Sequence, residues 1–225
     1  MPTWTTYSPG TTELAKVLAP SRTALVLIDF QNDFGHRDGV MGKTGVDMSC
    51  VPGAVAQAQA LIDAAHGAGA PVVFVSLQTT IRLDSRPATL RRERIGQPYA
   101  EATRVCRKGG WGADWYGIAP TPQDYQLEKA RYSSFQGTEL DLQLRALGVD
   151  TLVVGGLTTE CCVETAVRDA FHRDYHVFLA EDASASYDPE LHAASVRTMS
   201  LFHALIVRSA DVAAAWGAAA RAAAE

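Results

Sequence analysis

The sequence lacks the features that mark membrane-spanning, secreted and nucleic-acid-binding proteins. No apolar run is long enough to cross a bilayer. The first residues, Met1 to Tyr7, contain neither the basic stretch nor the apolar stretch of a secretory signal. Basic residues are not in excess, because the formal net charge is −5, which argues against a nucleic-acid or anionic-membrane surface. These absences predict a cytoplasmic protein without nucleic-acid or membrane partners.

Cysteine is scarce, and its spacing is not that of a disulfide framework. The chain contains 4 cysteines, Cys50, Cys106, Cys161 and Cys162. One adjacent pair and two scattered residues fit neither a set of paired disulfides nor the ligand spacing of a zinc site. We therefore expect free thiols in a reducing compartment.

Apolar residues, in contrast, are plentiful: 47% of the 225 residues are hydrophobic, enough for one domain with a large core. Short aliphatic runs alternate with helical patterns. The expected strands cover about residues 23–30, 71–76, 125–129, 151–154, 176–180 and 204–207. The expected helices cover about residues 51–68, 139–146, 162–170, 189–203 and 212–224. This order predicts a single α/β domain over residues 1–225, doubly wound and Rossmann-like, with a mainly parallel six-stranded sheet and helices on both faces.

One long segment, residues 77–123, interrupts the alternation. It lacks a clear strand, and it carries Trp111 and Trp115. A connection of this length is usually functional, so we expect it to form a lid over the site or a subunit contact. Its arginines fit either a phosphate or nucleic-acid patch or an ordinary solvated face, and the acidic neighbours Asp84, Glu93 and Glu101 favour the solvated face. The arginines are Arg82, Arg86, Arg91, Arg92, Arg94, Arg104 and Arg107.

Three reactive side chains follow or end predicted strands. Asp29 follows the first strand, Lys129 ends the third, and Cys162 opens the helix after the fourth. Because parallel strands end at the same edge of a sheet, an acid, a base and a nucleophile meet there, as covalent catalysis requires. The start of a helix also favours the reactive thiolate over the thiol.

Each of these residues alone also has a purely structural interpretation. An aspartate after a strand is commonly a turn residue, a lysine is commonly exposed, and Cys161 with Cys162 fits a buried structural pair at a strand–helix turn. The single residues leave both interpretations open, and only the coincidence of the three favours catalysis.

Three segments resemble motifs of the isochorismatase-like cysteine hydrolases. They are LVLIDFQNDF at residues 25–34, KARYSSFQGTEL at 129–140 and GLTTECCV at 156–163. The resemblance covers nearly the whole chain, from about residue 24 to about residue 207. Within the family it is strongest to the branch of ureidoacrylate amidohydrolases and biuret hydrolases.

The resemblance implies a catalytic triad of Asp29, Lys129 and Cys162. It further implies a non-proline cis peptide bond between Leu157 and Thr158, with the backbone N–H groups of Thr158 and Cys162 as the oxyanion hole. It implies a homo-oligomer, a dimer or a tetramer.

The chain also departs from some members of this family. Nicotinamidases carry an aspartate–histidine metal cluster after the second strand, whereas residues 76–80 read SLQTT here, so we predict no catalytic zinc and no cofactor. Isochorismatases proper lack the nucleophilic cysteine, so Cys162 disfavours vinyl-ether hydrolysis. Ala130 stands where the family usually has proline. Cys161 is expected to be a bystander.

The resulting hypothesis is a cysteine-dependent amidohydrolase. It cleaves a C–N bond of a small amide, ureido or carbamoyl substrate through a thioester and releases ammonia or an amine. The predicted substrate contacts are Asn32, Gln78, Tyr132 and Thr159. The alternatives are an isochorismatase-type or ester hydrolase of another small molecule, and a non-catalytic homologue that binds a small molecule.

Overall fold

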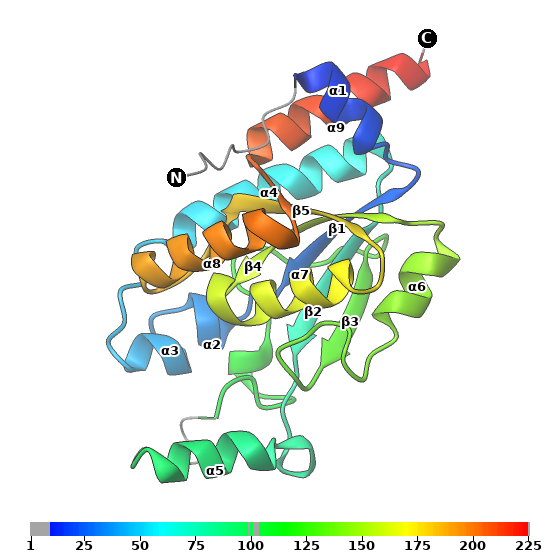
Figure 1. The fold of residues 1–225 in the computed structure, drawn as a ribbon. Helices are drawn as coiled ribbons and strands as arrows, with labels where there is room; N and C mark the ends of the chain where they lie inside the picture. The colour runs from blue at the N-terminus through cyan, green and yellow to red at the C-terminus, as the bar shows by residue number, and fades with distance from the viewer. Residues whose placement is uncertain (1–9, 99, 101–103, 225) are drawn as a thin grey trace.

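The computed structural model describes residues 10–98, 100 and 104–224. These residues contain one six-stranded sheet with the spatial order β3-β2-β1-β4-β5-β6, in which all neighbouring strands are parallel (Figure 1). The strands are β1 (Thr23–Ile28), β2 (Val72–Leu77), β3 (Tyr125–Lys129), β4 (Thr151–Leu157), β5 (His176–Ala185) and β6 (Leu205–Val207). The predicted doubly wound parallel fold is confirmed. The strand order reverses between β1 and β4, which is where ligands bind in such sheets.

Helices pack on both faces of the sheet (Figure 1). One face is covered by α1 (Thr11–Val17), α4 (Val51–Ala68) and α9 (Ser209–Ala224). The other is covered by α6 (Leu140–Ala146), α7 (Glu164–Phe171) and α8 (Pro189–Phe202). Strand β1 is buried at every residue, because Leu25 and Leu27 pack under the first group of helices while Val26 and Ile28 pack under the second. None of the described helices is long and apolar enough to span a membrane.

Strand β4 is longer than the sequence predicts. The prediction ended it at Val154, whereas the strand runs through Gly155 and Gly156 to Leu157. A Cβ atom on Gly156 would lie 2.3 Å from the carbonyl oxygen of Ile28, so this glycine permits close packing of β4 against β1. The prediction was wrong because glycine at a turn and glycine at a close approach look alike in a sequence.

Two other boundaries differ from the prediction. Strand β5 continues through Glu181 and Asp182, which were expected to follow it. The helix expected over residues 139–146 begins one residue later, because Glu139 is the N-cap of α6, and the Thr138 hydroxyl donates to the carbonyl of Ser134. The expected helix over residues 51–68 matches α4.

The connections at the carboxyl edge contain several short helices. The loop after β1 holds α2 (Asn32–Gly35) and α3 (Val40–Lys43), and residues 77–123 hold η1 (Ile81–Leu83), α5 (Arg86–Arg94) and η3 (Trp111–Ala113). Helix α5 has no buried residue and stands away from the sheet at the bottom of Figure 1.

Segment 77–123 forms hydrogen bonds with the polar residues that follow β1, at its start and in its later part. The Gln31 side-chain amide donates to the carbonyls of Leu77 at 2.9 Å and Ala113 at 2.7 Å. Asp33 accepts the backbone N–H of Cys106 at 2.6 Å. The segment is therefore anchored near η3 and exposed at α5. Its Glu101 lies outside the described residues.

Candidate active site

Asp29, Lys129 and Cys162 are in direct contact at the carboxyl edge of the sheet. The Lys129 ammonium donates to Asp29 Oδ2 at 2.8 Å and lies 3.3 Å from Cys162 Sγ. The side chains of Asp29 and Lys129 are both 0% exposed, and Cys162 is 4% exposed. The structure thus brings together the three residues that the sequence analysis selected.

The local folding of the chain explains how residues from three strands meet. Strands β1 and β3 flank β2 and so lie about 10 Å apart, a gap that the long stem of Lys129 crosses. Asp29 has a left-handed backbone, with φ of 57°, where the chain leaves β1. That conformation is uncommon for a residue other than glycine and costs about 1 kcal/mol or more. The Asp29 carboxylate binds Lys129 and does not act as the turn or cap ligand of the structural interpretation.

Cys162 is placed by the turn after β4. The peptide bond between Leu157 and Thr158 is cis, as the resemblance implied. One turn of π-helix, η4 (Thr159–Val163), follows and continues into α7. The Val163 N–H donates to the Thr158 carbonyl at 3.3 Å across this turn. Cys162 therefore lies in the first helical turn, as predicted, and the oxyanion role of the Thr158 and Cys162 N–H groups stays a prediction.

The charges of the three groups are set by burial and by one another. Burial raises the pKa of Asp29 above its usual range, although Lys129 opposes the shift. Burial alone would lower the pKa of Lys129, but the neighbouring Asp29 and Cys162 raise it above its usual value. A hydrogen bond with Cys161, burial and the charge of Asp29 raise the pKa of Cys162 well above that of a free thiol.

The raised pKa favours the thiol form of Cys162. Burial and the neighbouring carboxylate oppose the helix start, which favours the thiolate. Asp29 can still remove the thiol proton. Its Oδ2 binds Lys129, whereas its Oδ1 is buried without a hydrogen-bond partner among the described residues.

A cavity of about 410 Å³ lies beside the residues that follow Lys129, and Asp29, Lys129 and Cys162 are not among its lining residues. Its lining includes Ala130, Arg131 and Tyr132, which directly follow Lys129, and Thr165 of α7. Two hydrogen bonds connect the lining to the reactive groups: Lys129 donates to the Arg131 carbonyl at 3.1 Å, and Thr165 donates to the Cys161 carbonyl at 2.7 Å. The cavity is a candidate place for a small molecule near the reactive groups.

The other predicted contacts lie in different surroundings. Tyr132 lines this cavity and is 55% exposed. The Asn32 amide donates to the Trp111 carbonyl at 2.9 Å, and Gln78 lines a separate cavity of about 280 Å³. Thr159 is fully buried, with its hydroxyl 2.9 Å from Nδ1 of His192. Their roles in substrate binding stay predictions.

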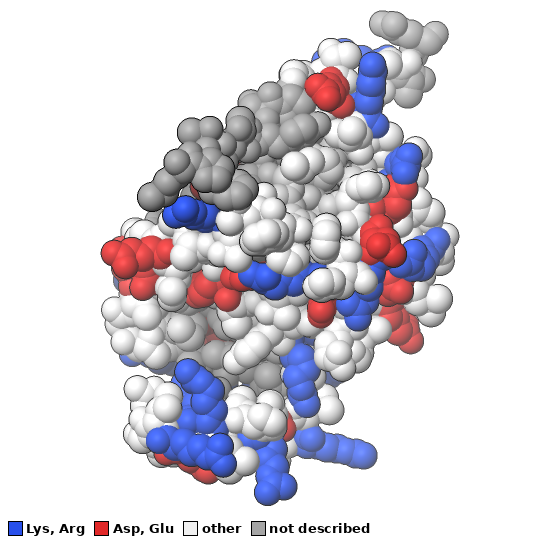
Figure 2. Space-filling view, viewed as in Figure 1, with Lys and Arg blue, Asp and Glu red and all other residues white. Residues whose placement is uncertain are grey.

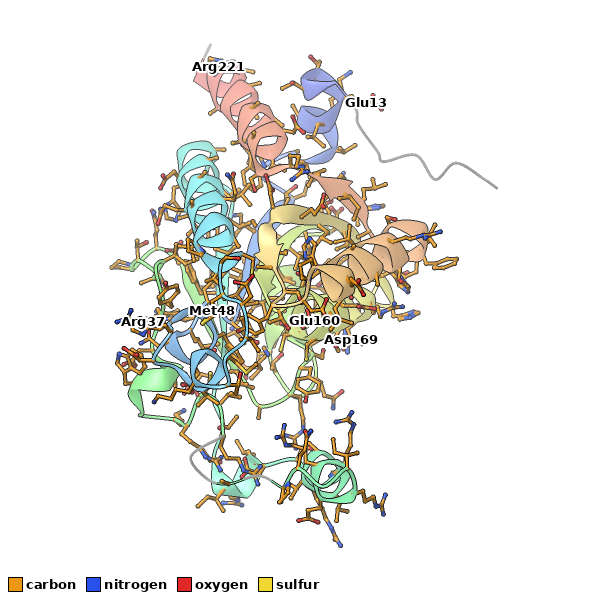
Figure 3. All side chains as sticks on the ribbon, turned by 90° about the vertical axis from the view of Figure 1, so that its left-hand side faces the viewer. Glu13, Arg37, Met48, Glu160, Asp169 and Arg221 are labelled. Atoms are coloured by element: carbon orange, nitrogen blue, oxygen red, sulfur yellow. The ribbon has the colours of Figure 1, made fainter. Side chains whose placement is uncertain are left out.

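Several polar side chains near the site escaped the sequence analysis. The Ser133 hydroxyl donates to Asp169 of α7, which Figure 3 labels near the centre of the view. Arg131 lies inside the motif at residues 129–140, so the sequence held a signal for it. His192 and Asp169 are far from the motifs in sequence, and only the fold brings them near the site.

The described residues contain no group of three or more His, Cys, Asp or Glu side chains placed to hold a metal ion. His172 follows α7 and His176 begins β5, so these two histidines, four positions apart in sequence, do not share a helix. All four cysteines are free, as predicted.

The chain is similar to known proteins. The isochorismatase domain matches residues 23–211. The chain is 33% identical over 212 residues to the ureidoacrylate amidohydrolase RutB of Methylobacterium radiotolerans, covering 88% of this chain and 79% of that protein.

Two solved structures have the same fold. A cysteine hydrolase from Pseudomonas syringae pv. phaseolicola superposes with a TM-score of 0.78 at 25% identity, covering 97% of this chain and 100% of that one. An N-carbamoylsarcosine amidase from Thermoplasma acidophilum superposes with a TM-score of 0.64 at 32% identity, covering 84% and 96% of the two chains.

Proposed function

The chain belongs to the isochorismatase family, and we propose that it is a cysteine-dependent amidohydrolase that cleaves a C–N bond of a small ureido, carbamoyl or amide substrate. The observation that carries the proposal is the Lys129 ammonium, which contacts both the Asp29 carboxylate and the Cys162 sulfur inside a closed site. Burying a charged lysine between a carboxylate and a thiol is costly. Packing alone does not account for this arrangement, because an apolar side chain would fill the same space without that cost.

In the proposed mechanism, Asp29 removes the proton of Cys162 through its free Oδ1 while Sγ attacks the substrate carbonyl. The N–H groups of Thr158 and Cys162 stabilise the oxyanion. The C–N bond then breaks, and Asp29 returns the proton to the leaving nitrogen. Water, deprotonated by Asp29, hydrolyses the thioester and restores the thiol. Lys129 remains charged throughout and keeps the acid–base carboxylate in place.

The names of the relatives support the substrate class. One relative is named as a ureidoacrylate amidohydrolase and another as an N-carbamoylsarcosine amidase. Both names describe C–N bonds next to a carbonyl group. The presence of Cys162 in contact with Asp29 and Lys129 favours this chemistry over vinyl-ether hydrolysis and over a binding protein without catalysis.

Ammonia release over a panel of ureido, carbamoyl and simple amides tests the proposal. We expect turnover of at least one ureido or carbamoyl compound. Loss of that turnover in Cys162→Ala, and its retention in the neighbouring Cys161→Ala, would support the assignment. A panel without ammonia release, but with hydrolysis of matching esters, would replace the amidase with the esterase alternative.

A further inference from the structure

His192 links helix α8 to the turn that carries Cys162. Its Nδ1 lies 2.9 Å from the hydroxyl oxygen of Thr159, the first residue of η4. Thr159 is fully buried, so its hydroxyl depends on a hydrogen-bond partner inside the protein. The position of η4 is therefore tied to the position of His192.

His192 is itself held from its other sides. Its backbone N–H donates to the Asp188 carbonyl at 3.0 Å at the start of α8, and the Asp188 side chain caps that helix. Its Nε2 lies 3.9 Å from one carboxylate oxygen of Glu181 in β5, and Arg208 lies 3.9 Å from the other oxygen. The carboxylate favours a proton on Nε2, which leaves Nδ1 as the acceptor for the Thr159 hydroxyl. The imidazole thus has a defined orientation.

The turn held in this way presents the backbone N–H of Cys162. In the described part of the chain, the Thr158 carbonyl accepts the N–H groups of Cys161 and Val163, at 3.2 and 3.3 Å, but not the N–H of Cys162 between them. Such π-helical turns are frequent at functional sites. In the proposed mechanism the Cys162 N–H donates to the oxyanion, so a shift of η4 would misplace this donor.

The surface cations gather away from this turn. Figure 2 shows Lys and Arg side chains concentrated at the end of the molecule formed by α5, whereas α8 crosses the middle of the same view (Figure 1). Lys129, the buried cation in contact with Cys162, is bonded to Asp29. Stabilisation of the oxyanion therefore depends on correctly placed backbone donors.

Resting on the proposed amidohydrolase function, we propose that His192 is a positioning residue, whose imidazole holds Thr159 and so keeps the Cys162 N–H directed at the oxyanion. His192 contacts neither the substrate nor the reacting atoms. Thr159 then acts in positioning as well, in place of the substrate contact predicted from the sequence. Because the oxyanion exists only after Sγ attacks, His192 affects the chemical step more than substrate binding.

The variant His192→Ala removes the partner of the Thr159 hydroxyl. With a ureido or carbamoyl substrate we expect kcat to fall by roughly tenfold to a hundredfold, because a misplaced donor stabilises the oxyanion less. KM stays within about threefold of the wild-type value. His192→Asn recovers most of the loss, since its amide occupies the position of Nδ1. Thr159→Val removes the same hydrogen bond from its other end and keeps the shape of the side chain, so it tests the contact even if His192→Ala does not fold.

The matched control is His66→Ala. The His66 side chain is 22% exposed, against 23% for His192, and its Nε2 lies 2.7 Å from Asp124. That pair lies at the amino end of β3, the opposite edge of the sheet from Cys162. His66→Ala therefore loses a comparable contact and leaves kcat unchanged. A fall of kcat in His66→Ala as large as in His192→Ala would assign both effects to lost stability and overturn the inference.

Two reagents separate the oxyanion from the nucleophile without amide turnover. In both reactions Asp29 takes the thiol proton. Sγ displaces iodide from iodoacetamide without forming an oxyanion, whereas its attack on the carbonyl of p-nitrophenyl acetate forms one before p-nitrophenolate leaves. In a Cys161→Ala background, measured on the peptide that contains Cys162, we expect His192→Ala to slow acylation by at least about tenfold and to leave alkylation within about twofold. This pattern supports the inference even if no amide is hydrolysed, in which case only the amidohydrolase proposal fails.

Three results of this experiment would overturn the inference. Equal slowing of both reactions in His192→Ala would mean that His192 supports the thiol or the fold in general. Unchanged acylation in His192→Ala or in Thr159→Val would mean that the contact does not position the donor. A wild-type protein that iodoacetamide alkylates and p-nitrophenyl acetate does not acylate would have no working oxyanion site to position.

Discussion

At the scale of single residues, the proposed chemistry depends on a proton shared within one buried group of charges. Asp29 and Lys129 neutralise each other at 2.8 Å, and removing either partner leaves an unpaired buried charge. We expect Asp29→Asn and Lys129→Ala each to lower kcat by at least about a thousandfold. The double variant loses little more than either single variant, because the two residues act as one unit. Additive losses in the double variant, measured by ammonia release, would contradict the shared triad.

Residue-scale electrostatics also predict the pH dependence. Because burial raises the pKa of Asp29, the carboxylate becomes protonated at a higher pH than an exposed aspartate does. A protonated Asp29 cannot accept the thiol proton, so kcat/KM declines as pH falls through this raised pKa. The acid limb of the kcat/KM profile should therefore have a pKa above that of an ordinary aspartate. The residual activity of Asp29→Asn should show no such limb. An acid limb at an ordinary aspartate pKa would count against Asp29 as the base.

At the scale of elements, the site depends on the close contact between β4 and β1. Gly156→Ala puts a Cβ atom 2.3 Å from the Ile28 carbonyl oxygen, and we expect it to reduce the free energy of unfolding by about 2 kcal/mol or more. Activity falls as well, because η4 and Cys162 follow this strand. Gly53→Ala on α4 is the matched control. It meets no atom within 4 Å and should stabilise the helix by up to about 1 kcal/mol. Equal unfolding midpoints in urea for the two variants would refute the close-approach argument.

Elements also show where sequence reasoning succeeds and where it stops. The buried strands and α4 were predictable because uninterrupted aliphatic runs and an alanine-rich helical pattern each have one good interpretation. The sequence did not show which residues bind the polar side chains after β1. Gln31 and Asp33 hold segment 77–123 in place, and Gln31 and Leu77 are more than forty positions apart in sequence. Likewise, the reactive residues were found from strand ends and motifs, whereas the contact between Ser133 and Asp169 joins residues that only the fold brings together.

At the scale of the whole molecule, the exposed part of segment 77–123 indicates how the site is covered. Ile81 is 82% exposed, Leu83 47% and Ile95 50%, and these apolar side chains flank α5, which buries none of its residues. We propose that the protein is a homo-oligomer, and that residues 81–116 help to close the site within it.

Light scattering at micromolar concentration measures the oligomeric state. We expect a dimer or a tetramer, and we expect deletion of α5 to raise KM and lower kcat together. A fully active monomer would contradict the oligomer, and full activity after the deletion would contradict the lid. The single substitution Ile81→Ser tests the same surface, and we expect it to weaken the oligomer.

The central claim is that Cys162 forms a covalent intermediate, and mass spectrometry of acid-quenched enzyme tests it most directly. During turnover of a ureido or carbamoyl substrate, we expect the peptide that contains Cys162 to gain the mass of the substrate's acyl group. The adduct is absent in Cys162→Ala, which folds but does not release ammonia, and it is present in Cys161→Ala. Turnover that continues in Cys162→Ala, or an adduct carried by Cys161 alone, would contradict the mechanism.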